Sequence, residues 1–284
     1  MLKQRSKINA FSWYGGKFLH LNWLLPILDT PCKHFVDVFG GSAAVILNRS
    51  PSPIETYNDI DSGLVNFFKV VRDDTAELIR VLSYTPYSRE EFITACDKLR
   101  DGVVPTPRQA RIEHARMYFL RARMAFMGKS QKAKQRDWSN SHKDSHGGRS
   151  GAVNKYHNSI DTLSAIANRL LQVQIENSSA TKLIQRLDRP DTLFYCDPPY
   201  LFSTREKGNC KCYSHEMTDD DHAQLAEVLN QCQGKVAISY YDHELMLGEL
   251  YPRNKWRRHY TDPRKLNGSY CKKIVQEMVL TNYK

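Results

Sequence analysis

The stretch of sequence that decides the fold is His34-Phe35-Val36-Asp37-Val38-Phe39-Gly40-Gly41-Ser42-Ala43-Ala44-Val45-Ile46-Leu47. Its apolar run has the length of a strand, its two glycines permit a tight turn, and the residues after them suit a helix. A second apolar run, at residues 54–57, leads into Asn58-Asp59, and Asp59 lies 19 positions after Gly40. This spacing is close to that of the acid that follows the glycine turn in nucleotide-binding β-α-β units. The sequence therefore predicts an α/β fold that begins with two such steps.

Further strands and helices are predicted toward the C-terminus. Strand-like runs lie at residues 173–175, 192–196, 235–240, 256–260 and 274–280. Helical patterns lie at residues 160–171 and 219–231, the second with Thr218 as its cap. Between the last two strands, Asn267-Gly268 is typical of a hairpin turn. We therefore predict a mixed sheet with one antiparallel strand.

The central part of the chain has a different pattern. From residue 73 to about 159 helical periodicity dominates, most clearly at residues 109–127, which Gly128 ends. Residues 129–155 are rich in Lys, Ser, Asn and Gly and are expected to form a polar loop that is mobile unless a partner orders it. We predict one α/β domain, made of residues 1–73 and 160–284, which a mainly helical insert at residues 74–159 interrupts.

The composition excludes several classes of protein. Of the 284 residues, 41% are hydrophobic and 25% are charged, as in soluble globular proteins. No apolar run approaches the roughly 20 residues that cross a bilayer, and the N-terminus lacks the apolar core of a signal peptide, so we expect a cytoplasmic protein. The seven cysteines are scattered and are expected to be reduced thiols. Cys210, Cys212 and His215 lack the spacing of common zinc sites, so no metal is expected.

The positive charge is concentrated in the central region. The whole chain carries a net charge of +10, and residues 108–155, with 12 basic and 3 acidic side chains, hold +9 of it. Trp138 and Tyr156 are interspersed among these Arg and Lys residues. Such a local field is typical of a surface that binds a polyanion, although a solvated helix face has the same composition.

The tetrapeptide Asp197-Pro198-Pro199-Tyr200 directly follows a predicted strand, at the edge of the sheet where open α/β folds bind ligands. An amino group conjugated to a ring, such as adenine N6, is a poor nucleophile, so its catalyst needs acceptors that draw on its N–H bonds. The Asp197 carboxylate and the Pro198 carbonyl can supply two acceptors, and the two prolines stiffen the backbone. The ring of Tyr200 offers a face on which an extruded base can stack.

Together these segments resemble the Dam-like, D12-class family of DNA adenine-N6 methyltransferases, almost from end to end. Trp13-Tyr14-Gly15-Gly16-Lys17 looks like the tryptophan-x-glycine-glycine-lysine motif of that family, and residues 35–42 resemble its glycine loop. The order also agrees, because the cofactor motif precedes the insert and the catalytic motif follows it. Where many relatives have serine-asparagine-histidine, this chain has Ser239-Tyr240-Tyr241.

The resemblance implies a Rossmann-like methyltransferase core that transfers a methyl group from S-adenosylmethionine, leaving S-adenosylhomocysteine, with no metal and no covalent intermediate. It assigns the adenine chemistry to Asp197, Pro198, Pro199 and Tyr200. The residues that it assigns to the cofactor, with Asp59 on the ribose, are Trp13, Lys17, Asp37, Phe39, Gly40, Gly41, Asp59 and Asp197.

The helical insert is then expected to be the DNA-recognition module, acting on double-stranded DNA as a monomer. Lys132, Lys134 and Arg136 are expected to contact phosphates. The candidates for reading bases are Arg116, Arg121, Arg123, Lys129 and Arg149.

Two alternatives stay open at this point. Since the tetrapeptide polarises any amino group of this kind, the target could be cytosine N4 or an adenine in RNA. A catalytically inactive regulator that binds nucleic acid is the other alternative.

Overall fold

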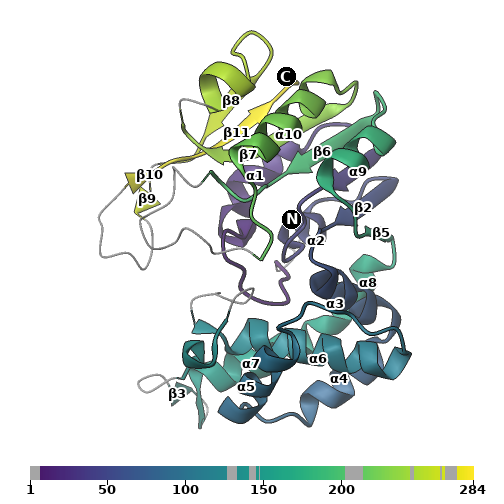
Figure 1. Cartoon of the computed structure of the whole chain (residues 1–284), viewed down its shortest axis with the longest axis vertical. Coiled ribbons are helices and arrows are strands. Elements are labelled where there is room, and N and C mark those ends of the chain that lie inside the picture. Colours follow the sequence, from purple (N-terminus) through teal and green to yellow (C-terminus); the bar gives the residue numbers. More distant parts are fainter. Residues whose placement is uncertain are drawn as a thin grey trace, which may run out of the picture.

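The computed structural model describes residues 7–126, 133–140, 145–146, 148–201, 214–243, 246–262, 264–265 and 274–284. In this part of the chain one seven-stranded sheet has the order β5-β2-β1-β6-β7-β11-β8 (Figure 1). Its strands are β1 (His34–Asp37), β2 (Ile54–Asn58), β5 (Val173–Glu176), β6 (Thr192–Cys196), β7 (Lys235–Tyr241), β8 (Arg257–Tyr260) and β11 (Glu277–Thr281).

The sheet is parallel except at one strand. β1 pairs in parallel with β2 on one side and with β6 on the other, and β6 pairs in parallel with β7. β11 runs antiparallel to both of its neighbours, β7 and β8. The predicted mixed sheet with one antiparallel strand is therefore confirmed. From β1 the chain adds β2 and β5 on one side and then returns to place β6 and β7 on the other side. The carboxyl ends of β1 and β6 therefore border the crevice in which such sheets bind ligands.

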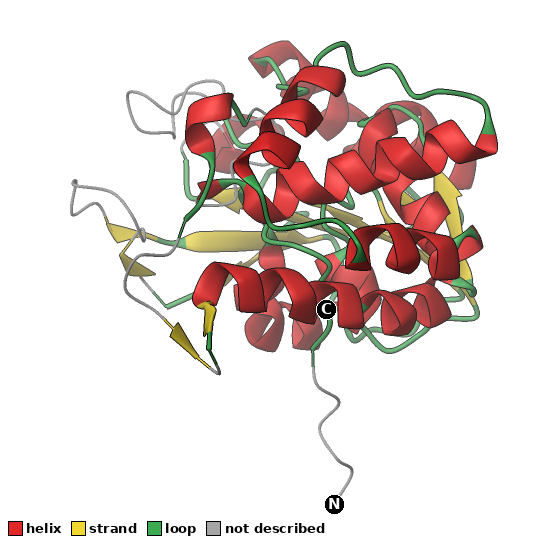
Figure 2. Ribbon diagram, turned by 90° about the horizontal axis from the view of Figure 1, so that it is seen from below, coloured by secondary structure: helices red, strands yellow, loops and turns green. Residues whose placement is uncertain are grey.

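Alternate residues of the central strands face two different layers of helices. Phe35, Leu193 and Tyr195 belong to one buried cluster, whereas Val36 and Phe194 belong to the other. This alternation is the period-two pattern of a sheet that is buried on both faces. Figure 2 shows helices on both sides of the strands. On the second face lie α9 (Ala180–Leu187), α10 (Asp219–Gln231) and the π-helix η6 (Met246–Leu250).

The first face is covered by a second group of helices. These are α1 (Leu21–Leu28) after the short η1 (Lys17–His20), α2 (Ala44–Asn48), α3 (Ser62–Asp73) and α8 (Leu163–Leu170). Of these helices, α3 and α8 also contact the helices of the insert. The helices of the insert gather at one end of the molecule, below the sheet in Figure 1. They are α4 (Thr75–Ser83), α5 (Arg89–Lys98), α6 (Arg108–Met124) and α7 (Gly151–Asp161), with η4 (Gln135–Asp137) between the last two.

No boundary separates the insert from the catalytic half within the core. Phe67 of α3 stacks on Phe119 of α6, with ring centroids 6.1 Å apart, and Tyr118 lies 6.3 Å from Phe67. The same buried cluster continues into Phe35 of β1. The division into a catalytic domain and a recognition insert at residues 74 and 159 therefore stays a prediction. In the structure the two parts share one hydrophobic core.

Two sequence predictions about the insert and the C-terminus need correction. The polar loop was expected to extend to residue 155, but α7 begins at Gly151, because the Ser150 side chain caps it by accepting from the Val153 amide and Tyr156 anchors it in the core. A hairpin of two short strands, β3 (Ser145–His146) and β4 (Arg149–Ser150), also lies within the segment predicted as a polar loop.

The last predicted strand, residues 274–280, is divided into β10 (Ile274–Val275) and β11, and β10 pairs with β9 (Arg264–Lys265). The predicted turn at Asn267-Gly268 lies outside the described residues.

Candidate active site

A cavity of about 300 Å³ lies at the carboxyl ends of β1 and β6. All eight residues that the sequence assigned to a cofactor line it, namely Trp13, Lys17, Asp37, Phe39, Gly40, Gly41, Asp59 and Asp197. These residues come from four separate segments of the chain, which the parallel register of β1, β2 and β6 brings together.

The glycine turn after β1 is fitted closely to its neighbours. A Cβ atom on Gly40 would lie 2.2 Å from the ring of Tyr57, whose hydroxyl donates to the Gly41 carbonyl at 2.8 Å. Gly41 itself has φ +49°, and a Cβ atom there would lie 2.9 Å from Nε1 of Trp13. Both positions therefore require glycine, one for space and the other for conformation as well. The turn packs Trp13 directly against the loop.

Asp59, at the end of β2, organises two loops around the cavity. One carboxylate oxygen accepts from the Gly41 amide and the other from the Asp61 amide, each at 2.9 Å. Asp61 in turn caps α3 by accepting from the amides of Gly63 and Leu64. Burial raises the pKa of Asp59 to about 7. Asp59 thus ties the glycine turn to the start of the next helix.

Lys17 and Asp197 form a buried ion pair beside the tetrapeptide. Nζ of Lys17 lies 2.7 Å from Oδ1 of Asp197, and the Lys17 side chain is only 4% exposed. The same ammonium donates to the Gly15 carbonyl at 3.0 Å and lies 5.1 Å from the centre of the Tyr200 ring. Burial raises the pKa of Asp197 to about 6, and the charge of Lys17 opposes that rise. Lys17 therefore favours the ionised carboxylate.

The cavity is rich in carboxylates relative to its cations. Asp37, Asp59 and Asp197 all line it, together with Lys17. Oδ2 of Asp37 is buried and has no hydrogen-bond partner in the described part of the chain, and burial, with the negative charge of Asp197, raises the pKa of Asp37 to about 8. A cationic ligand would relieve this accumulation of acids. The donor set thus fits a ligand that carries positive charge.

The tetrapeptide residues have different surroundings. Pro199 lines the cavity, whereas Pro198 is buried and does not line it. Tyr200 is 8% exposed, and its ring lies edge to face against Tyr241 with the centroids 4.6 Å apart. The neighbouring Tyr240 ring is 5.9 Å away. The Ser-Tyr-Tyr sequence that departs from many relatives therefore builds an aromatic wall around Tyr200.

The sequence did not point to the wall of the cavity that follows β5. Ser179, Ala180 and Thr181 line this side. Asn58 fixes the loop, since its amide donates to the carbonyls of Val38 and Ser178 while its oxygen accepts from the Ser178 amide at 2.9 Å. The sequence could have indicated these residues, because the predicted strand at 173–175, if parallel to its neighbours, must end at the same edge of the sheet as they do.

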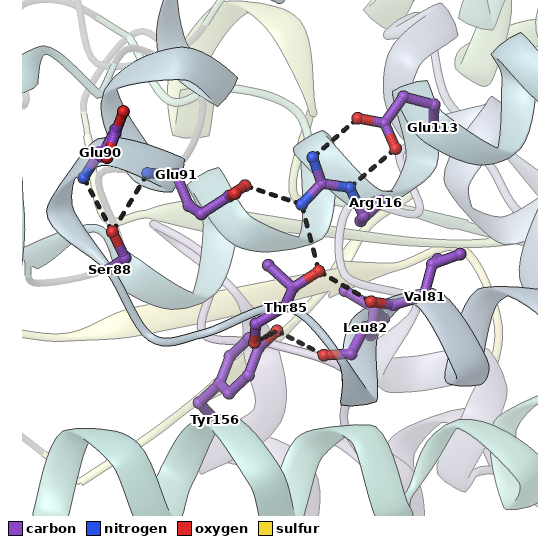
Figure 3. Close-up of polar contacts among 9 residues, drawn as sticks. All are labelled: Val81, Leu82, Thr85, Ser88, Glu90, Glu91, Glu113, Arg116 and Tyr156. Atoms are coloured by element: carbon purple, nitrogen blue, oxygen red, sulfur yellow. Dashed lines mark hydrogen bonds and ion pairs between the residues drawn. The ribbon is translucent and has the colours of Figure 1, made fainter.

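The predicted DNA-binding arginines have unequal surroundings. Arg116 makes a two-point contact to Glu113, with both distances 2.7 Å, and also contacts Glu91 at 2.8 Å and Thr85 at 3.2 Å (Figure 3). Its guanidinium thus links α6 to α5 and to the end of α4. This geometry indicates a structural role for Arg116, and its contact with DNA stays a prediction.

The other predicted DNA contacts are distributed over the insert. Arg123 donates to the Lys155 carbonyl at 2.6 Å, and burial lowers the pKa of Arg123 to about 10. Lys134, Arg136 and Arg149 are exposed, and Arg121 is 9% exposed. Lys129 and Lys132 lie outside the described residues.

A doubly wound sheet with a glycine turn, an acid after the second strand and Asp-Pro-Pro-Tyr at its switch point defines a Rossmann-like methyltransferase. Comparison with known families makes this specific. The model of the D12 class N6 adenine-specific DNA methyltransferases matches residues 13–260, and the chain belongs to this family. It is therefore an enzyme that methylates adenine N6 in DNA, as the sequence predicted.

One curated relative is similar over its whole length. It is the type II methyltransferase M1.LlaDCHI of Lactococcus lactis subsp. cremoris, which is 24% identical over 99% of both chains. A crystal structure of a Haemophilus influenzae protein described as a methylase covers 94% of this chain and 88% of that chain, at 12% identity. Its TM-score of 0.34 is too low to support any further statement.

Two structural observations concern membranes and metals. Among the described residues no helix has the length and apolar character that a membrane crossing requires. Nor does the described part of the chain bring three or more His, Cys, Asp or Glu side chains together as a metal site would. Cys210 and Cys212 lie outside it.

Proposed function

We propose that the chain transfers a methyl group from S-adenosylmethionine to N6 of an adenine extruded from double-stranded DNA, at a specific recognition sequence. The observation that carries the proposal is the Lys17–Asp197 ion pair, because it holds an ionised carboxylate in the same cavity as the glycine turn and Asp59. Adenine in the DNA of a bacterium or phage would be its substrate, and the enzyme would then act in the cytoplasm.

The cavity residues fit the cofactor in charge and shape. The cofactor supplies an electrophilic methyl group on a sulfonium. Asp37, with its unpartnered carboxylate oxygen, and the backbone of Gly40 and Gly41 would hold the methionine end. Asp59 would accept from the ribose hydroxyls, and Trp13 would pack against the bound molecule. Ser179 to Thr181 would enclose the adenosine end.

The tetrapeptide would act on the incoming adenine. The Asp197 carboxylate and the Pro198 carbonyl accept hydrogen bonds from the N6 amino group and so favour the pyramidal nitrogen that attacks the methyl carbon. Lys17 keeps Asp197 ionised and in position. The ring of Tyr200 supports the extruded base by stacking, with Tyr241 behind it. Catalysis in this scheme consists of positioning and polarisation, with direct transfer and no covalent enzyme intermediate.

The insert would bind the duplex through its basic surface. Lys134, Arg136 and Arg149 are exposed there and are proposed contacts, together with Arg121 and Arg123. Exposed basic side chains that neutralise phosphates release counterions and give most of the affinity of a DNA-binding module. A monomer acting on double-stranded DNA is the simplest arrangement.

Methyl transfer from isotopically labelled cofactor tests the proposal. Duplex DNA and RNA are each incubated with the enzyme and digested to nucleosides, and N6-methyl-2′-deoxyadenosine, from DNA alone, is the expected product. N4-methylcytosine or methylated RNA would contradict the target. Cofactor binding without any transfer would instead indicate a catalytically inactive regulator. Sequencing of the methylated DNA then gives the recognition sequence.

A further inference from the structure

A second cavity, of about 1050 Å³, lies beside the first, between the loop after β2 and the helical insert. The two cavities share part of one wall, since Ile60, Asp61 and His215 line both. On the side of the insert, the second cavity is lined by residues of α5, α6 and η4, among them Arg121 and Arg136. It therefore adjoins the proposed cofactor site from the side of the DNA-recognition module.

Arg121 of α6 is buried in this cavity wall, and no described residue provides it with an anionic partner. It is 9% exposed, and its Nε atom has no hydrogen-bond partner among the residues that the structure describes. Its guanidinium lies 4.9 Å from the centre of the Tyr118 ring, but within the described part of the chain it makes no ion pair. Arg116, on the same helix, uses its donors on two glutamates. Arg121 therefore still has N–H donors available for a ligand, whereas those of Arg116 already bind glutamates.

The acids of this cavity are engaged elsewhere. Asp61 accepts from the Tyr118 hydroxyl at 2.9 Å and from the first amides of α3. Asp97 pairs with Arg100 and accepts from Gln135. Asp101 accepts from the Val103 amide at 3.0 Å. The positive charge of Arg121 is therefore left for a ligand, with the exposed Lys134 and Arg136 at the rim.

We propose that this cavity binds a backbone phosphate of the substrate DNA, with the guanidinium of Arg121 as its principal ligand. A planar guanidinium matches two phosphate oxygens with two parallel hydrogen bonds, and burial strengthens such a contact. The proposal rests on the proposed function, because it takes DNA as the partner. It adds one defined phosphate site to the general basic surface, next to the cavity in which the methyl group is transferred.

The test measures duplex affinity at several salt concentrations without cofactor. Arg121→Gln should weaken binding by about ten- to a hundredfold, the range expected for a charge-assisted contact. It should also flatten the log-log salt dependence by roughly 0.9, which is the loss of one phosphate contact. Arg121→Lys should keep the slope and lose only several-fold in affinity, because the charge stays but the two-point geometry does not.

Arg108→Gln is the matched control, since Arg108 lies on the same helix, is 69% exposed and pairs with Asp74 away from the cavity. Its slope should stay as in the wild type. If the slope of Arg108→Gln flattens as much as that of Arg121→Gln, the experiment reports only the net charge of the protein, and the phosphate site is disproved. An unchanged slope in folded Arg121→Gln overturns the proposal directly. Should that variant not fold, unaltered affinity in Arg121→Lys overturns it instead.

Inorganic phosphate separates the two possible sources of the ligand. The melting temperature of the wild type is compared in phosphate and in chloride at equal ionic strength, and then in Arg121→Gln. A shift that Arg121→Gln abolishes, joined to a flattened DNA slope, supports a DNA phosphate site. The same shift with an unchanged DNA slope would make this a small-anion site and overturn the proposal. Wild-type protein that binds DNA but transfers no methyl group would contradict only the proposed function.

Discussion

The catalytic half and the helical insert each bury a cation, and the two cations have opposite surroundings. Lys17, 4% exposed, forms a 2.7 Å ion pair with Asp197. Arg121, 9% exposed, makes no ion pair with any residue that the structure describes. A buried charge with an internal partner positions a group of the protein itself, whereas a buried charge without one is costly and can be stabilised by an external anion. The difference teaches that the catalytic pair is formed without substrate, whereas the insert, as we propose, takes its anion from the DNA.

The largest expected effect comes from removing the anion of the catalytic pair. Asp197→Ala should lower the rate of methyl transfer by at least about a thousandfold, since it removes an acceptor for the reacting amine. DNA affinity should change little, because the insert supplies the phosphate contacts. Single-turnover kinetics and duplex binding measure the two separately. Near-normal transfer in this variant would mean that the ion pair is structural.

The aromatic wall gives the next effect. Tyr200→Ala should lower catalytic efficiency by about ten- to a hundredfold, because stacking of a base on an aromatic ring is worth roughly 1 to 3 kcal/mol. A mismatch at the target adenine, which eases extrusion, should recover part of this loss. Tyr200→Phe should retain most of the activity. If Phe is as damaging as Ala, the hydroxyl beside Asp197 matters more than the ring, and the stacking account is wrong.

Removing the cation of the pair should act through pH. Burial already raises the pKa of Asp197 to about 6, and Lys17 opposes the rise, so in Lys17→Met the carboxyl should become protonated at higher pH. The acidic limb of the rate profile should move up by about one pH unit, so that activity falls about twofold at pH 7 and about fivefold at pH 6, and recovers toward pH 8.5. Lys17→Arg serves as the control that keeps the charge. A lower rate with an unmoved profile would contradict this role of Lys17.

The smallest effect belongs to the exposed rim of the insert. Replacing Lys134 and Arg136 together by Gln should weaken duplex binding about three- to tenfold and make it less sensitive to salt, with methyl transfer at saturating DNA unchanged. Equilibrium binding at two salt concentrations is sufficient. An unaltered salt dependence would show that these two residues form a solvated face, and would leave Arg121 as the principal cation of the cavity.

The elements of the catalytic half could be predicted from sequence because local patterns determine them. The glycine turn, Asp59 and the tetrapeptide each follow a strand, and a parallel sheet places the ends of its strands at one edge. All eight predicted cofactor residues therefore line one cavity. The antiparallel β11 was also foreseen, although its predicted turn at Asn267-Gly268 lies outside the described residues.

The insert was less predictable because tertiary contacts decide the roles of its residues. Arg116 and Arg121 are five positions apart on one helix. Glu113, three residues before Arg116, is the only local sign that the two differ, and the contact of Arg116 with Glu91 of α5 cannot be read from α6. The extent of α7 was missed for a similar reason, since the burial of Tyr156 stabilises a helix in a segment whose composition is polar.

The continuous core has a consequence for engineering and evolution. Since Phe67 of α3 stacks on Phe119 of α6, an exchange of recognition modules at residues 74 and 159 would cut through packed aromatic rings. A chimera that carried α3 and α8 along with the insert would instead join the two parents in the loops bordering β2 and β5. Under the proposed role of the insert, new sequence specificities should therefore arise more readily by point substitutions on its surface than by exchange of residues 74–159 alone.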